Sequence, residues 1–256
     1  MHQSRLTRRI LECRHDGRPA LIPFLPAGFP TKAAFWDHLQ ECDDSGAAVI
    51  EIGVPFSDPM ADGPVVEEAS QQSLAQDVNL DWILDELAEH RSGLQAEIVL
   101  MGYCNPFFQY GWDRLAARAS EAGASGLIIP DLPLEESADL RQLLAEHNIL
   151  LIPLIGLNTS RERMQAYAGV AQGYVYFVSV MGTTGARTTL PRQLLARLQE
   201  AKTIFDQPLA LGFGLRSPDQ LQELNQAVDA VVFGSALIEH IKAGGRAREF
   251  MARWKE

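Results

Sequence analysis

The chain has 256 residues, 46% hydrophobic and 21% charged, so it is long enough for one large core, such as a barrel, or for two small domains. Its formal net charge of −11 argues against nucleic-acid binding, because no basic stripe could offset the phosphate backbone. The three cysteines are widely spaced and suggest neither a disulfide framework nor a zinc ribbon. With no secretory signal and no apolar run of membrane-spanning length, we expect a cytoplasmic protein.

Short apolar runs typical of buried strands recur along the chain and alternate with amphipathic helical patterns. The strands are predicted at residues 20–24, 49–53, 97–101, 125–129, 150–154, 174–178, 208–212 and 230–233. They are apolar on both faces, as the strands of a parallel sheet covered by helices are. The helical patterns between them include residues 36–42, 82–89, 115–121, 140–146, 194–201 and 221–224.

This alternation predicts an α/β protein with a parallel sheet, and eight such units can close into a TIM (β/α)8 barrel. We predict a single barrel domain over residues 1–256, with a doubly wound open sheet as the alternative. An amphipathic helix near residues 4–13 precedes the first strand and could plug the barrel floor. The long gap after the second strand predicts an extra helix near residues 66–75, and another helix is predicted after the last strand.

In a barrel, function resides where strands end and the following loops begin. Residues 49–64, VIEIGVPFSDPMADGP, place Glu51 inside an otherwise apolar strand. An ionised carboxylate is costly there unless it is paired or functional. Desolvation would raise its pKa, which suits a group that must both donate and accept a proton. The alternative is a structural glutamate neutralised by an arginine in the core.

Asp58 and Asp62 follow in a loop stiffened by three prolines. Asp-Pro and Asp-Gly pairs are common turn formers, so the loop by itself leaves a structural and a functional role open for both residues.

Glycines recur after the last three predicted strands, in SVMGTTGAR (179–187), LGFGLRSPDQL (211–221) and VVFGSALIEHI (231–241). Phosphate sites in such barrels use backbone N–H groups of these loops and a short helix N-terminus. Gly214 would allow close backbone approach, while Gly234 and Ser235 open a helix whose positive dipole end would face an anion. Each glycine alone can be a simple turn, but their joint placement favours a phosphate site.

Some chemistry is disfavoured by what the chain lacks. None of its four lysines lies on or at the C-terminal end of a predicted strand, so a Schiff-base aldolase is unexpected. No His, Cys and Asp cluster has the spacing of a zinc site. If this barrel breaks a carbon–carbon bond, it is expected to do so with carboxylates and without a metal.

Several motifs occur in the same order as in tryptophan synthase alpha chains, and the sequence resembles that family over essentially its whole length. They are residues 49–64, PFLPAGFP (23–30), GYCNPFFQYG (102–111), IIPDLPLEES (128–137), SVMGTTGAR, LGFGLRSP and FGSAL. The resemblance implies that the catalytic residues are Glu51 and Asp62. It places Phe24, Tyr103, Tyr176 and Thr184 at the substrate, and Gly185, Gly214, Gly234 and Ser235 at its phosphate.

The resemblance further implies a metal-free lyase of tryptophan biosynthesis, which splits indole-3-glycerol phosphate into indole and glyceraldehyde 3-phosphate by retro-aldol cleavage. Glu51 would carry both proton transfers, and an ionised Asp62 would stabilise the cationic indolenine. Because the loop at 182–189 is rich in Gly and Thr, we expect it to be mobile until a ligand orders it, with Arg187 as a trypsin site.

The implied partner is a tryptophan synthase beta subunit, in an α2β2 heterotetramer in which the beta subunit, and not this chain, carries pyridoxal phosphate. Indole would pass directly to that subunit, so the docking face is expected at the C-terminal rim of the barrel. The rim residues expected there are Asp58, Pro59, Asn105, Phe107, Phe108 and Asp131. Both phenylalanines are expected to be exposed, although burial of one under the loop is the alternative.

Two rival functions remain at this point. One is another phosphate-binding barrel, such as an isomerase or an indole-glycerol-phosphate synthase, the latter expected to have a catalytic lysine at a strand end. The other is a barrel without activity that only regulates its partner.

Overall fold

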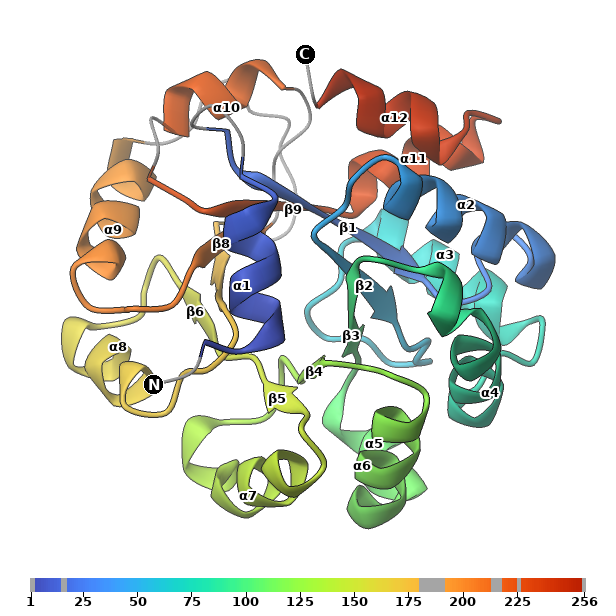
Figure 1. The fold of residues 1–256 in the computed structure, drawn as a ribbon, viewed down its shortest axis with the longest axis horizontal. Coiled ribbons are helices and arrows are strands. Elements are labelled where there is room, and N and C mark those ends of the chain that lie inside the picture. The colour runs from blue at the N-terminus through green and yellow to red at the C-terminus, as the bar shows by residue number, and fades with distance from the viewer. Residues whose placement is uncertain (1–2, 15–17, 180–191, 213–217, 225–226, 255–256) are drawn as a thin grey trace.

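The computed structural model describes residues 3–14, 18–179, 192–212, 218–224 and 227–254, which form a ring of parallel strands surrounded by helices (Figure 1). The strands are β1 (Ala20–Pro26), β2 (Val49–Gly53), β3 (Glu97–Met101), β4 (Gly126–Ile128), β5 (Leu150–Leu151), β6 (Leu154–Gly156), β7 (Val175–Val178), β8 (Leu209–Gly212) and β9 (Ala230–Phe233). The helices are α1 (Arg5–Glu12), α2 (Lys32–Asp44), α3 (Pro64–Leu74), α4 (Leu80–His90), α5 (Cys104–Tyr110), α6 (Trp112–Glu121), α7 (Ala138–Glu146), α8 (Arg161–Ala168), α9 (Arg192–Lys202), α10 (Asp219–Leu224), α11 (Ser235–Lys242) and α12 (Ala247–Arg253), with 3-10 turns η1 (Arg91–Gly93) and η2 (Leu134–Glu136). Within these residues no helix is long and apolar enough to cross a membrane.

The sheet closes on itself through the fifth predicted strand. The strand order is β5-β4-β3-β2-β1-β9-β8-β7-β6, so its two ends are consecutive in the chain. The N–H of Ile152 donates to the carbonyl oxygen of Leu127 in β4 (2.9 Å). The N–H of Tyr176 in β7 donates to the carbonyl oxygen of Pro153, just before β6 (3.0 Å). One extended segment thus pairs with β4 through its first half and with β7 through its second. Pro153 has no N–H to donate, which explains the break between β5 and β6. The predicted barrel, not the open sheet, is confirmed.

Side chains alternate between two apolar layers because successive residues of a strand point to opposite faces. The inward set includes Val49, Val99, Ile128, Tyr174 and Tyr176, which pack together inside the ring. The outward set packs against the surrounding helices in a larger cluster. Glu51 is in register with Phe24 of β1 and Val99 of β3, and so belongs to the inward set.

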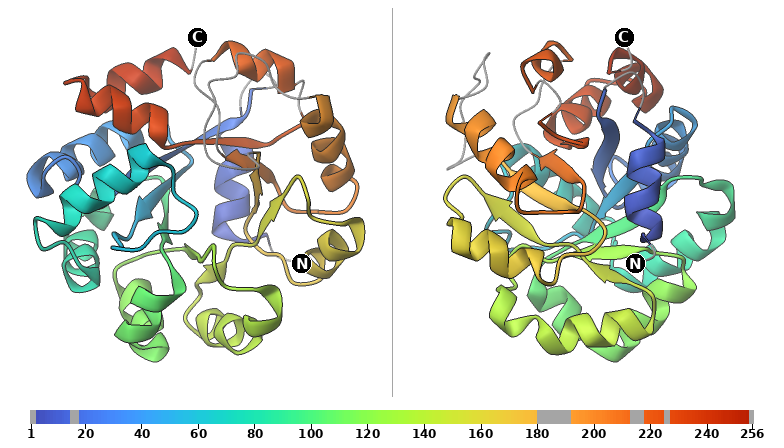
Figure 2. Two further views of the ribbon diagram at one scale, coloured as in Figure 1. Left: turned by 180° about the vertical axis from the view of Figure 1, so that it is seen from behind. Right: turned by 60° about the vertical axis from the view of Figure 1, so that its left-hand side comes forward.

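Helix α1 lies within the outline of the strand ring (Figures 1 and 2). Leu6 and Ile10 are almost completely buried against the inward-facing strand residues, and the Thr7 hydroxyl donates to Gly173 O (2.6 Å) just before β7. The helix therefore covers the end at which the strands begin. Functional groups must then collect at the other end, where the strands stop.

Candidate active site

A cavity lies at the C-terminal ends of β1 to β4. Three residues expected to line a substrate site or to act on the substrate lie together there, namely Phe24, Asp62 and Tyr103. The remaining lining residues are Gly53, Val54, Ser70, Met101, Gly102 and Pro130. The walls are mostly apolar, as a pocket for a flat aromatic ring should be, with Asp62 and Tyr103 supplying polar atoms.

Two glycines make room for the Phe24 ring. A Cβ on Gly53 would lie 2.6 Å from Phe24 Cζ, and a Cβ on Gly234 would lie 2.8 Å from Phe24 Cδ1. The ring thus reaches from the end of β2 to the end of β9, where Gly234 and Ser235 begin α11. The phosphate-binding role of these two residues stays a prediction. Thr184, Gly185 and Gly214, together with the loop at 182–189, lie outside the described residues.

Glu51 is completely buried in the middle of β2. The Tyr174 hydroxyl donates to Glu51 Oε1 (2.7 Å), whereas Oε2 has no hydrogen-bond partner within the described part of the chain. Burial raises the pKa of Glu51 to about 8, although the hydrogen bond from Tyr174 opposes that rise. Among the described residues no arginine pairs with Glu51, so the structural alternative of a core ion pair finds no support.

Asp62 stands at the edge of the cavity, where Tyr103 holds its loop in place. The Tyr103 hydroxyl accepts a hydrogen bond from the N–H of Ala61 (2.9 Å) and also interacts with the Asp62 carboxyl. Burial raises the pKa of Asp62, and burial raises the pKa of Tyr103 to about 12. Tyr103 therefore stays protonated and can steady the loop that carries Asp62.

A sequence profile of the family described as tryptophan synthase alpha chain matches residues 10–256. This chain belongs to the tryptophan synthase alpha chain family. It is 59% identical to the tryptophan synthase alpha chain of Solidesulfovibrio magneticus over 100% of both chains. Among solved structures it is similar to Mycobacterium tuberculosis tryptophan synthase, with a TM-score of 0.90 and 33% identity over 99% of this chain and 97% of that chain. It is also similar to the tryptophan synthase complex from Pyrococcus furiosus, with a TM-score of 0.84 and 32% identity over 93% and 97% of the two chains.

Sequence reasoning named Tyr176 of strand β7 in this alpha-chain family member and missed Tyr174, just before that strand. Tyr176 is buried and lies across Gly212, where an added Cβ would be 2.2 Å from its Oη. Tyr174, just before the strand, is the residue that bonds Glu51. A signal was available, since residues two apart in a strand share a face, and the resemblance had placed Tyr176 at the substrate.

Most of the residues predicted to form the rim are at least partly exposed, as a docking face requires. Asp58 and Asn105 are exposed. Pro59 is partly exposed. Asp131 is exposed too, and its Oδ1 accepts the N–H of Cys104 (2.8 Å), which caps the start of α5. Contact of these residues with a partner stays a prediction.

Helix α5 turns the two predicted rim phenylalanines in different directions. Phe108 is 60% exposed, but Phe107 is completely buried, so the expectation that Phe107 is exposed for a partner is wrong. Its ring packs on Gly102, where an added Cβ would be 2.9 Å from Phe107 Cζ. Neighbouring positions on a helix point about 100° apart, and the apolar interior takes only one of the two rings.

Proposed function

We propose that this chain cleaves indole-3-glycerol phosphate into indole and glyceraldehyde 3-phosphate, the alpha reaction of tryptophan biosynthesis. Family membership over the full length supports this reaction. The single observation that carries it is a completely buried Glu51, with its pKa raised to about 8 and one oxygen without a hydrogen-bond partner among the described residues, near a cavity lined by Asp62. A carboxyl group of that pKa can both donate and accept a proton near neutral pH.

The reaction needs two proton transfers. Protonated Glu51 gives its proton to C3 of the indole, which becomes a cationic indolenine. The bond from C3 to the glycerol carbon then breaks, and its electron pair restores the aromatic indole. The hydroxyl on that carbon becomes the aldehyde and returns its proton to the Glu51 carboxylate. Since the Glu51 carboxyl bonds Tyr174 and does not line the cavity, it must turn from Tyr174 to reach the substrate.

Asp62 stabilises the indolenine as it forms. Its position at the cavity edge allows an ionised carboxylate to face the indole N–H, which becomes more acidic as positive charge develops on the ring. At the far end, backbone amides of Gly185, Gly214, Gly234 and Ser235 bind the phosphate. Binding energy at the phosphate then orients the bond that reacts.

The partner is the beta subunit of tryptophan synthase, in an α2β2 heterotetramer in the cytoplasm. The similarity to a chain of the Pyrococcus furiosus tryptophan synthase complex supports this pairing. The exposed side chains of Met60 (83%) and Phe108 (60%) supply apolar surface near the strand ends. Residues 1–256 act as a single barrel domain that uses no cofactor of its own, and pyridoxal phosphate is bound by the beta subunit.

The deciding experiment measures indole release from indole-3-glycerol phosphate by the purified chain, with and without a beta subunit. We expect slow release alone and faster release in the complex, because the partner orders the loops around the cavity. If no indole is released in either case, the remaining interpretation is a barrel that only regulates its partner. Turnover of a different sugar phosphate would favour the isomerase alternative.

A further inference from the structure

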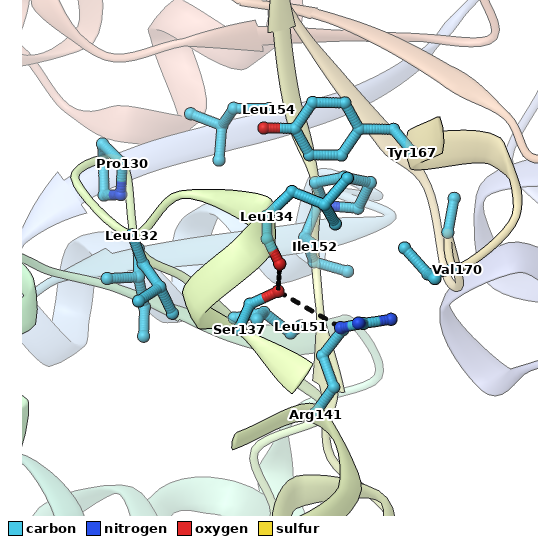
Figure 3. Close-up of a pocket in the computed structure, with 13 residues that line it drawn as sticks. Pro130, Leu132, Leu134, Ser137, Arg141, Leu151, Ile152, Leu154, Tyr167 and Val170 are labelled. Carbon is cyan, nitrogen blue, oxygen red and sulfur yellow. Dashed lines mark hydrogen bonds between the residues drawn. The ribbon is translucent and has the colours of Figure 1, made fainter. Parts of the chain in front are cut away.

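A second cavity lies outside the barrel, in the groove between α7 and α8 (Figure 3). Its floor is the segment from Leu151 to Leu154, which closes the sheet. One wall comes from η2 and α7, and the other from Tyr167 and the residues that follow α8. The cavity is small, with a volume of about 70 Å³, and it is partly open to solvent, so a ligand seated there would extend out of it.

Most of the lining side chains are apolar, and the polar ones are Ser137, Arg141 and Tyr167. Figure 3 shows Ser137 and Arg141 together at one side, with Leu154 and the Tyr167 ring on the opposite side. Arg141 Nε donates to Ser137 Oγ (3.2 Å), and the Ser137 hydroxyl donates to Leu134 O (2.7 Å). Within the described residues, nothing accepts a hydrogen bond from the two terminal nitrogens of the partly buried Arg141. The guanidinium is thus anchored by one nitrogen and keeps donors for a ligand.

The two walls of the groove are tied together beside the cavity. Arg163 of α8 forms a two-pronged ion pair with Glu135 of η2, in which Nη2 lies 2.8 Å from Oε2. The same guanidinium lies 5.2 Å from the centre of the Tyr167 ring. Glu135 is therefore already neutralised by Arg163, and Arg141 is the one charged side chain among the described residues that line the groove.

We propose that this groove binds a small aromatic monocarboxylate. One guanidinium balances one carboxylate and can bind both of its oxygens. A phosphate dianion would leave a second charge against leucine side chains, which is unfavourable. The rings of Pro130, Pro153 and Tyr167 offer flat surfaces on which an aromatic body can pack.

The test must separate this groove from the candidate active site, because Pro130 lines both cavities. Arg141 lines only the groove, and Asp62 lines only the candidate active site. Arg141→Met removes the charge and keeps an apolar stem, while Asp62→Asn changes the other cavity. Arg161→Met is the matched control, since Arg161 pairs with Glu200 and does not line the groove.

The experiment is isothermal titration of the full chain with 3-phenylpropanoate and with its neutral amide, after thermal unfolding has shown that each variant is folded. We expect the acid to bind at least about tenfold more tightly than the amide, a factor that a charge-assisted pair readily supplies. Arg141→Met should abolish that preference, while Arg161→Met and Asp62→Asn keep it. Equal binding of acid and amide, no binding at millimolar acid, an unaffected Arg141→Met or loss in Asp62→Asn would each overturn the proposal. Because binding is measured without turnover, the result stands apart from the proposed lyase activity.

Discussion

At the end of the barrel where the strands begin, Asp229 and Glu97 are buried and well paired. Asp229 accepts hydrogen bonds from Arg14 (2.8 Å), Lys202 (2.6 Å) and the N–H of Leu209 (2.8 Å). Glu97 bonds Ser125 and ion pairs with two arginines. Further along the strands, Glu51 is more deeply buried, yet its only hydrogen-bond partner in the described chain is a tyrosine hydroxyl.

This difference separates two uses of a buried carboxyl group. Paired carboxylates at the strand starts join α1 and α9 to the sheet and stabilise the fold. The under-paired Glu51 lowers stability in its charged form, and such a perturbed group is typical of a functional site. The comparison predicts that substitution of Glu51 lowers activity without lowering stability. Substitution of a paired carboxylate at the strand starts should lower stability without lowering activity.

The largest effect on activity is expected from Glu51→Gln. The amide keeps the shape but cannot shuttle protons, so kcat should fall by about 10²–10⁴-fold with substrate affinity nearly unchanged. The free energy of unfolding at neutral pH should be equal or higher, because Glu51 must take up a proton on folding at that pH and glutamine does not. Single-turnover indole release and urea unfolding measure the two quantities. A variant that keeps more than about a tenth of the wild-type kcat would remove Glu51 from proton transfer.

Asp62→Asn tests the second carboxylate of the candidate site. Without its negative charge the indolenine is less stabilised, and kcat should fall by about 10²–10³-fold. Tyr103 can still interact with the amide, so the fold should be unaffected. Steady-state kinetics at saturating substrate would show the loss, and a near wild-type rate would contradict the electrostatic role.

Asp229→Asn should do the reverse at the other end of the barrel. Replacing the carboxylate weakens its bonds to Arg14 and Lys202, and the free energy of unfolding should drop by about 1.5–3 kcal/mol, as for hydrogen bonds to charged groups. Turnover per folded molecule should stay close to wild type. Chemical denaturation and an active-site-normalised rate give the answer, and a large kcat loss at unchanged stability would undo the comparison.

The pH dependence of stability provides a finer test. The pKa of Glu51 is raised to about 8 in the folded protein from an unperturbed 4.5, so between these values the folded state binds more protons than the unfolded state. Its contribution to stability is therefore full below pH 4.5 and is lost as pH rises through about 8. The wild type should lose stability relative to Glu51→Gln over that window. The free energy of unfolding of both proteins can be measured with urea between pH 5 and pH 8. If it changes with pH in the same way for both, the pKa of Glu51 is not raised in the folded protein.

Tyr174→Phe should have the smallest effect. One neutral hydrogen bond contributes about 0.5–1.5 kcal/mol, so kcat should change by about tenfold or less. The bond from Tyr174 lowers the pKa of Glu51, and its loss should move the Glu51 limb of the pH–rate profile to higher pH. A profile at the wild-type position would show that Tyr174 does not tune Glu51.

The strand positions and the barrel were predictable because they rest on local pattern. Short apolar runs identify the strands. Their alternation with helical patterns in eight units restricts the topology to few choices. Glu51 could be singled out for the same reason. A charged residue inside an apolar strand is expected to be buried with that strand. Tyr174 was within reach of the same reasoning by strand alternation.

Helix α5 was not predictable in this way, because its support comes from distant residues. Its first N–H is capped by Asp131, 27 residues further along the chain, and Phe107 finds its place only against Gly102 and the end of β3. No periodic pattern in a seven-residue segment reports such contacts.

By itself, then, the sequence determined the alternating elements, the carboxyl group within an apolar strand and the family motifs, since each depends on residue spacing along one segment. Only the tertiary structure decided which oxygen of Glu51 is bonded, which phenylalanine is buried, and that a groove with an anchored Arg141 opens between α7 and α8. Those outcomes depend on the separation and orientation of side chains from different strands and helices, which are set when the barrel closes and its layers pack.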